Sequence, residues 1–289
     1  MEMLSNIDYA KRAKDAGLNI YFIAEGDRGE EIRCQRAVPA NPNCNSYSIA
    51  KAFVVTAFGI LYDRGVISPE MKVYDILSDR FPRGFDPNWK EVTLRDVMLH
   101  RIGIAKDCID IDNETGETYP KDTDYLGLLL SSPLPNKPGS AYKYNDAGYY
   151  LLSRVIERVA GEGPDAILRP IVMKVMGFKE FAWSVCPDGY CIGATGLYIR
   201  TEDMVKLGIL YMNGGVWNGV RILSEEWVSA VLENGYEIAP KGNGWYGKGG
   251  MRGQMLAFHP TLGRAVAWHA FEDVDFEVML PPSDTSAAE

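Results

Sequence analysis

A long apolar segment in the first quarter of the chain constrains the fold most. After Ser46-Tyr47-Ser48 the sequence reads IAKAFVVTAFGILYDRG, which is apolar on nearly every helical face until Asp63 and is closed by Gly65. A helix of this kind must be buried inside a domain. Its uncharged stretch from Ala52 to Tyr62 has 11 residues, against about 20 for a bilayer span. We therefore predict the central helix of a globular protein and no transmembrane helix.

Strand-like runs occur at both ends of the chain, and helical periodicity occupies the middle. The runs cover 19–24, 31–38, 245–251, 254–259 and 264–271. Helices are expected at 6–16, 93–99, 124–130 and 146–160, and at 202–212 and 225–233 after the N-caps Thr201 and Ser224. We predict an α/β plus all-α fold. An antiparallel sheet flanked by helices, built from 1–65 and 190–289, would carry an inserted helical domain of 66–189.

The net charge and the cysteine content restrict which partners and which cellular compartment we expect for this protein. The 289 residues contain 30 basic and 39 acidic side chains, a formal charge of -9 that repels a phosphate backbone, so no nucleic-acid partner is expected. The chain has five cysteines and no C-x-x-C pair, which predicts free thiols in a reducing compartment. Its first segment has no apolar region of the kind found in secretory signals, so we predict a cytoplasmic protein. No residue cluster has zinc spacing, so no metal or cofactor is expected. The oligomeric state stays open.

A serine and a lysine share one face at the start of the apolar helix. Ser48 and Lys51 are three residues apart, which places them on the same side of a helical turn. Burial favours a neutral lysine, and a helix N-terminus stabilises negative charge on the serine oxygen. The pair could therefore activate a hydroxyl. The tetrapeptide alone is weak evidence, because a second S-x-x-K, Ser140 to Lys143, follows Lys137-Pro138-Gly139 in a loop.

Four further segments follow Ser48 in a fixed order, at 93–103, 144–152, 195–204 and 248–250. They echo the patterns T-x-x-x-L-L-x-H-x-S-G, Y-S-N-x-G-Y-x-L-L, GG-L-x-S-T-x-x-D-L and H/K-x-G. With them the chain resembles the serine β-lactamase and penicillin-binding-protein superfamily, especially its class C-like branch that includes esterases. The resemblance spans about residues 19–272. It implies a β-lactamase-like fold and a serine hydrolase, and it leaves the substrate open.

The resemblance also implies roles for individual residues. Ser48 would be the acylated nucleophile, Lys51 its deprotonating or proton-shuttling partner, and Tyr144 a second acid or base. Two ammonium groups, Lys51 and Lys248, would favour the phenolate form of Tyr144. Which of Lys51 and Tyr144 takes the first proton stays open.

The final strand would supply the remaining parts of the site. Lys248 would orient a substrate carboxylate or the tyrosine, and the N–H groups of Ser48 and Met251 would form an oxyanion hole. Gly249 and Gly250 would let the substrate approach the strand.

Several positions depart from the family pattern. Asp146 stands where the pattern has asparagine, Ile102 replaces its serine, and Gly249 replaces the threonine usual in β-lactamases. Asp146 is expected in the catalytic group, where its negative charge would tune Lys51 or disfavour substrates that bear a carboxylate. No helix is evident after Phe271. These departures favour a cytoplasmic esterase or amidase acting on a small ester, amide or peptide. A catalytically silent binding or sensor domain, and a β-lactamase or D-amino-acid peptidase, remain as alternatives.

Other candidate residues have structural explanations. His100 is expected to be a hydrogen-bonded structural residue, and Tyr211 with Asn213 is a weaker rival to Tyr144. A group of acidic residues could rim the pocket and select against anions: Asp107, Asp110, Asp112 and Glu114.

Overall fold

The computed structural model describes residues 4–109, 111–112 and 122–284, and the chain forms two compact units. Unit 1 comprises 1–49, 171–182 and 197–289, and unit 2 comprises 50–170 and 183–196. The expected domain bounds, 1–65 with 190–289 and 66–189, stay a prediction about independently folding domains. Of the acidic residues expected at the pocket rim, Asp110 and Glu114 lie outside the described residues.

Unit 1 is built on a six-stranded antiparallel sheet that joins the two ends of the chain, as predicted. The strand order is β2-β1-β11-β10-β9-β8, so the N-terminal hairpin pairs directly with the last strand. The bounds are β1 Ile20–Asp27, β2 Ile32–Arg36, β8 Ala239–Gly242, β9 Trp245–Gly250, β10 Gln254–His259 and β11 Arg264–Ala270. Every residue of β10 is buried, which shows that both faces of the central sheet are covered.

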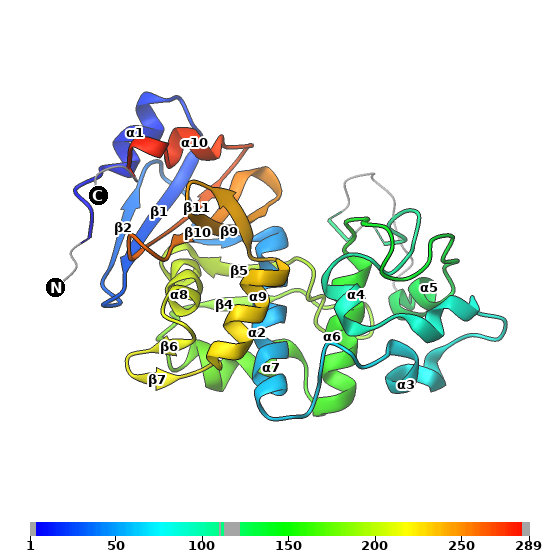
Figure 1. Ribbon diagram of the computed structural model, residues 1–289. Coiled ribbons are helices and arrows are strands. Elements are labelled where there is room, and N and C mark those ends of the chain that lie inside the picture. The colour runs from blue at the N-terminus through cyan, green and yellow to red at the C-terminus, as the bar shows by residue number, and fades with distance from the viewer. Residues whose placement is uncertain (1–3, 110, 113–121, 285–289) are drawn as a thin grey trace. The chain divides into compact units, whose positions relative to one another are not determined.

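Helices cover both faces of this sheet within unit 1. On one face α1 and α10 lie side by side over a core that includes Trp245, Met255 and Trp268 (Figure 1). On the other face α8 packs against β1, β10 and β11. The helices and 3₁₀ turns of the unit are α1 Tyr9–Asp15, η1 Tyr47–Ile49, α8 Thr201–Met212, α9 Glu225–Asn234, η5 Met251–Gly253, α10 Phe276–Met279 and η6 Pro282–Asp284.

Short strands complete the β-structure. A three-stranded sheet has the order β3-β5-β4, and β6 pairs with β7. Their bounds are β3 Asn43–Asn45, β4 Phe181–Trp183, β5 Leu197–Arg200, β6 Val216–Trp217 and β7 Val220–Arg221. Because β3 is followed directly by η1, this small sheet holds the segment that leads into Ser48.

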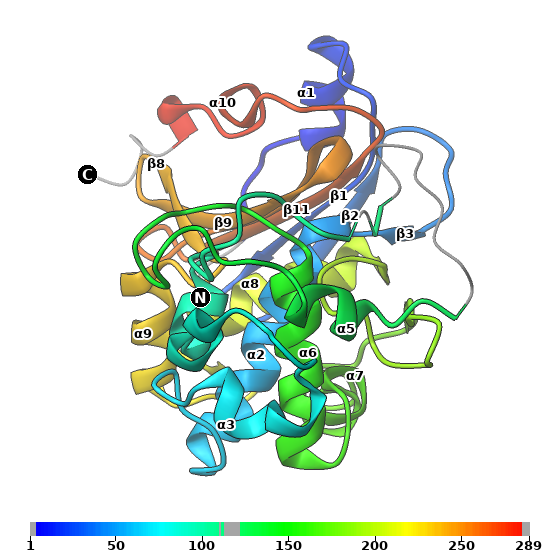
Figure 2. The same ribbon diagram turned by 90° about the vertical axis from the view of Figure 1, so that its right-hand side faces the viewer.

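Unit 2 is helical, and the all-apolar helix predicted from the sequence is its core. All residues of α2 from Ala50 to Leu61 are buried, and α2 lies beside α6 (Figure 2). The helices are α2 Ala50–Asp63, α3 Val73–Leu77, α4 Leu94–Met98, α5 Tyr125–Leu130, α6 Ala147–Ala160 and α7 Pro164–Leu168, with the 3₁₀ turns η2 Ser78–Arg80 and η3 Pro87–Glu91. A π-helical turn, η4 Arg169–Met173, follows α7.

Two local expectations were wrong. Thr201 is the first residue of α8 and not its N-cap, because its hydroxyl is within 2.7 Å of the buried His269 Nδ1. A short helix, α10, does follow the last strand, and its Met279 packs into the core beneath α1. Its four residues are too few to show a helical period in the sequence.

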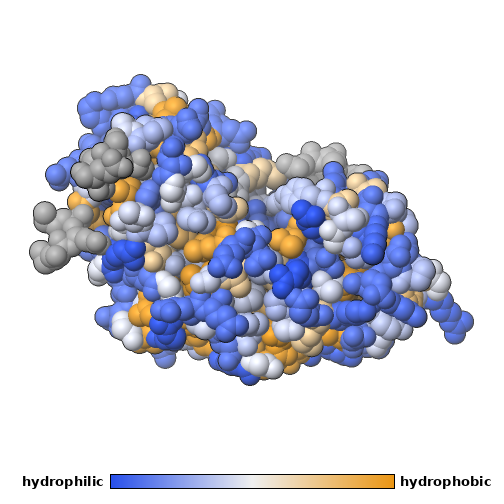
Figure 3. Space-filling view, viewed as in Figure 1, coloured by the Kyte–Doolittle hydropathy of each residue, from blue (hydrophilic) through white to orange (hydrophobic). Residues whose placement is uncertain are grey.

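Hydrophilic residues cover most of the face shown in Figure 3, with smaller apolar areas between them. No helix among the described residues is long and apolar enough to cross a membrane. The expected cytoplasmic location stays a prediction.

Candidate active site

The turn that carries Ser48 is fixed by its neighbours in unit 1. The buried Ser46 donates from both its backbone N–H and its hydroxyl to the carbonyl of Leu197, each at 2.8 Å. Asn45 Oδ1 accepts the N–H of Tyr47 at 2.9 Å. Tyr47 has a φ of +48°, a left-handed conformation that is rare outside glycine. Ser48 therefore lies on a tightly held turn that runs directly into α2.

The end of β9 approaches this turn closely. A Cβ on Gly250 would lie 2.5 Å from the carbonyl oxygen of Ser46, so only glycine fits without a shift of the backbone. A Cβ on Gly249 would meet nothing closer than Met255 Cε at 3.6 Å. Met251 begins the 3₁₀ turn η5 directly after the strand. Unit 1 thus brings the backbone of Ser46 to Ser48 against the strand end predicted to face the substrate.

Lys248, on β9, forms a buried ion pair with Glu237. The Glu237 side chain is 3% exposed and that of Lys248 is 12% exposed. Nearby, burial and then the charge of Lys248 lower the pKa of Lys241 below its usual range. Because a carboxylate already balances Lys248, its positive charge is not wholly available to a substrate anion.

In unit 2, α2 places the fully buried Lys51 in a cluster of polar and aromatic side chains. Its Nζ donates to Asp146 Oδ1 at 2.6 Å and to the carbonyl of Ala194 at 2.9 Å. The same nitrogen lies 4.9 Å from the ring centroid of Tyr144 and 5.9 Å from that of Tyr149. Burial alone disfavours an ammonium, whereas a carboxylate at hydrogen-bond distance stabilises it. This geometry is that of a charged lysine paired with Asp146.

Tyr144 is held by the residues on either side of it. Lys143 donates its N–H to the carbonyl of His100 at 2.8 Å, and Asn145 donates its N–H to His100 Nδ1 at 3.3 Å. The rings of His100 and Tyr144 lie 4.4 Å apart. His100 thus makes hydrogen bonds as the sequence predicted, and its structural role stays a prediction. The side chain of Tyr144 stays 38% exposed, so it is open to a reactant.

Asp146 stands at the N-cap of α6 without capping it. Its carboxylate pairs with Lys51, and Asp107 accepts the N–H groups of Asp146 and Ala147 in its place. Burial raises the pKa of Asp107, and these backbone hydrogen bonds oppose the rise. Asp112, the other described member of the acidic group, accepts from the hydroxyl of Thr195 at 2.8 Å.

The two rival motifs have structural roles of their own. Ser140 is exposed and its hydroxyl donates to the carbonyl of Lys137, closing a turn. Tyr211 is buried within α8, and Asn213 donates to the carbonyl of Arg28.

Sequence reasoning missed Ser46 and Glu237, and it did not foresee that Asp107 binds the start of α6. It did expect the charge of Asp146 to act on Lys51, and the two side chains are in contact. Ser46 precedes Ser48 by two residues and gave a local signal as a small polar residue before a helix. Glu237 carries no local signal, because it meets Lys248 through the pairing of β8 with β9. In the structure Glu237 has a φ of +63°, which its sequence does not indicate.

Comparison with known proteins decides the family. A family model described as beta-lactamase matches residues 21–275, which is most of the chain. The chain belongs to the beta-lactamase family. Members of this family are typically serine hydrolases, and the predicted superfamily and fold are confirmed.

Individual members of the family are only distantly similar. The 6-aminohexanoate-dimer hydrolase of Paenarthrobacter ureafaciens is 22% identical over 206 residues, covering 68% of this chain and 53% of that protein. Unguisins hydrolase from Aspergillus violaceofuscus is 23% identical over 63% of this chain and 30% of its own length. The chain thus matches about half or less of the length of these two relatives.

Solved structures of the family share the fold over nearly the whole chain. A penicillin-binding protein homologue from Caulobacter crescentus has a TM-score of 0.73 at 15% identity and covers 99% of this chain and 100% of that one. A family VIII carboxylesterase has a TM-score of 0.72 at 15% identity, over 97% and 94%. At these identities the likeness is one of fold.

Proposed function

We propose that this beta-lactamase family protein is a serine hydrolase that cleaves an ester or amide of a small molecule through an acyl-enzyme on Ser48. One observation carries the proposal. A buried lysine one turn after Ser48, Lys51, is held by Asp146 and lies 4.9 Å from the ring of Tyr144, which remains partly exposed. A lysine with only a structural role usually keeps its ammonium group in water. Lys51 is instead fully buried beside a partly exposed phenol, which is typical of a functional site.

In the proposed reaction Tyr144 is the base and Lys51 stays charged. Lys51 already donates to a carboxylate and to a carbonyl, so both of these contacts suit its ammonium form. The phenol oxygen of Tyr144 takes the proton of the Ser48 hydroxyl as Oγ attacks the substrate carbonyl. The N–H groups of Ser48 and Met251 stabilise the oxyanion.

The intermediate then collapses and the cycle closes. The bond to the leaving oxygen or nitrogen breaks, and Tyr144 returns the proton to it, which leaves the acyl group on Ser48. A water molecule next gives its proton to Tyr144 and attacks the acyl ester. The acid departs and Ser48 recovers its proton. No cofactor is needed.

The names of the relatives support this reaction class. They include a hydrolase of a 6-aminohexanoate dimer and a carboxylesterase, which suggests carbonyl cleavage with varied leaving groups. The alternatives kept from the sequence are a silent binding domain and a β-lactamase or D-amino-acid peptidase.

Hydrolysis of 4-nitrophenyl butyrate tests the proposal. We expect Ser48→Ala to lower kcat/KM at least about 1,000-fold, and Lys51→Ala and Tyr144→Phe to lower it about 100- to 10,000-fold, as lost nucleophile and lost acid–base groups do. Ser140→Ala, at the serine of the second S-x-x-K, is the matched control and should match the wild type. Circular dichroism of each variant verifies folding.

The outcomes separate the alternatives. Equal activity in the wild type and Ser48→Ala would overturn the acyl-enzyme, and a folded but inactive wild type would favour the silent binding domain. Labelling of Ser48 by benzylpenicillin, seen as an added mass on the intact protein, would identify the β-lactamase or peptidase alternative.

A further inference from the structure

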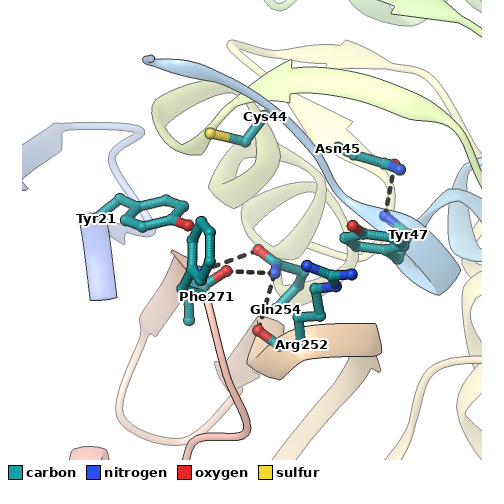
Figure 4. Close-up of a pocket in the computed structure, with 8 residues that line it drawn as sticks. Tyr21, Cys44, Asn45, Tyr47, Arg252, Gln254 and Phe271 are labelled. Carbon is teal, nitrogen blue, oxygen red and sulfur yellow. Dashed lines mark hydrogen bonds between the residues drawn. The ribbon is translucent and has the colours of Figure 1, made fainter. Parts of the chain in front are cut away.

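A pocket in unit 1 lies beside the two turns that carry Ser48 and Met251. It has a volume of about 110 Å³, and its walls include three aromatic residues, Tyr21, Tyr47 and Phe271, and three polar ones, Asn45, Arg252 and Gln254 (Figure 4). Tyr47 directly precedes Ser48, and Arg252 directly follows Met251. A group bound here would therefore adjoin both amides assigned to the oxyanion hole.

Arg252 makes this pocket positive. No acidic residue is among the described residues that line the pocket. Within the described part of the chain, Arg252 forms no ion pair with a carboxylate. Burial raises the pKa of the lining thiol, Cys44, so that thiol stays uncharged at neutral pH. In Figure 4 the guanidinium of Arg252 extends toward the ring of Tyr47. The exposed guanidinium is available to an anion from solvent.

The backbone of Arg252 is held in an unusual conformation. Its φ is +57°, in the left-handed region. The buried Gln254 donates to the carbonyl of Arg252 at 3.0 Å, and Trp268 Nε1 donates to the carbonyl of Gly253 at 2.9 Å. Gln254 also donates to the carbonyl of Ala270 at 2.7 Å and accepts its N–H. A residue other than glycine keeps a left-handed backbone only where several surrounding contacts hold it there, and such residues often occur at ligand-binding sites.

The pocket fits a small group with an anionic end. Its volume of about 110 Å³ is well above the space that a single water molecule needs, so the pocket has room for a small group such as a carboxylate with a methylene. The ring pair Tyr21 and Phe271, 5.5 Å apart, offers an apolar wall to methylenes. An arginine fork matches a carboxylate better than a point charge does. Lys248, by contrast, is already paired with Glu237.

We propose that Arg252 binds a carboxylate at the far end of the substrate's acyl group, so that the preferred substrates are esters or amides of short dicarboxylic acids. The kinetic part of this inference rests on the proposed function, whereas binding at Arg252 does not require it.

Matched substrates test the inference. Mono-4-nitrophenyl adipate carries a carboxylate, and 4-nitrophenyl hexanoate has the same acyl length without one; rates found with Ser48→Ala are subtracted as background. We expect the wild type to prefer the adipate by at least about 10-fold in kcat/KM. Arg252→Asn should reduce that preference about 10- to 100-fold, as loss of a hydrogen bond to a charged group does. Asparagine suits a left-handed backbone, so the turn should survive.

Controls and a binding measurement make the result decisive. Arg83→Gln removes one exposed charge outside the pocket and should leave the preference unchanged. Ligand-observed NMR on Ser48→Ala should detect monomethyl adipate and not dimethyl adipate, and Arg252→Asn in that background should abolish the signal. Binding that depends on Arg252 without turnover would sink the proposed function alone. An unchanged preference and unchanged binding in Arg252→Asn would overturn this inference.

Discussion

At the scale of single residues, two lysines of the candidate site pair with carboxylates through tertiary contacts. Lys51 meets Asp146, and Lys248 meets Glu237. An unpaired buried ammonium costs several kcal/mol, so each lysine requires a partner that the fold supplies. Asp146, which departs from the family pattern, is the partner of Lys51. The departure therefore has a structural reason, whatever its effect on the reaction.

The two neighbouring glycines of β9 should respond differently to a methyl group. Gly250→Ala would set a Cβ against the carbonyl of Ser46. We therefore expect the free energy of unfolding to fall by about 1–3 kcal/mol and kcat/KM to fall as well. Gly249→Ala has room, and we expect its stability to stay within about 0.5 kcal/mol of the wild type. Urea unfolding of both variants checks this. Equal losses in the two would show that Gly250 is not fixed by contact with Ser46.

At the scale of elements, the start of α6 is organised by residues from outside the helix. Asp146 occupies the N-cap, but its carboxylate is engaged by Lys51. Asp107, 39 residues earlier, accepts the free N–H groups in its place. A carboxylate at a helix N-terminus also interacts favourably with the helix dipole. The helix start, the lysine and the tyrosine segment thus depend on one another.

Removing the external cap should weaken this arrangement. We expect Asp107→Ala to lower the free energy of unfolding by about 1 kcal/mol, the usual cost of a lost cap, and to lower kcat with 4-nitrophenyl butyrate because the Tyr144 segment loses its support. Ser224→Ala removes the cap of α9, where Ser224 accepts from Trp227 at 3.0 Å. This control should lose similar stability and keep its kcat. Normal kcat in Asp107→Ala would contradict the link to Tyr144.

At the scale of the whole molecule, a buried histidine makes stability depend on pH. His269 on β11 is fully buried against Thr201 of α8, and burial lowers its pKa to about 3. Unfolding exposes a histidine with an ordinary pKa of about 6.5. Between these values the unfolded chain binds a proton that the folded chain does not. Stability must therefore fall as the pH falls from about 6.5 toward 3.

Urea unfolding at two pH values isolates this contribution. Between pH 7.5 and 5.5 we expect the wild type to lose about 1.4 kcal/mol more than His269→Asn, because asparagine does not titrate but can still bond to Thr201. A single low-pH measurement would mix in other groups, and the difference between the two proteins removes them. Identical losses would mean that His269 is not buried in its neutral form.

The sequence by itself determined the longer elements and the chemistry-bearing motifs. The apolar run of α2, the capping serine of α9 and the strand-like runs are local patterns, and local patterns act over a few residues. Their order along the chain was enough to predict the sheet joining both chain ends and the superfamily. The positions of Ser48, Lys51 and Tyr144 came from the same motifs, although their roles remain proposals.

Only the tertiary structure decided which groups meet. Lys51 and Asp146 are 95 residues apart, and no periodicity relates them. Thr201 could cap a helix by its local sequence, but packing of α8 on β11 gave its hydroxyl a buried histidine instead. Likewise, the need for glycine at position 250 comes from its contact with Ser46, and the conformation of Arg252 is held by Gln254. Pairing of buried polar groups is a long-range requirement, because each must find a partner wherever folding places one.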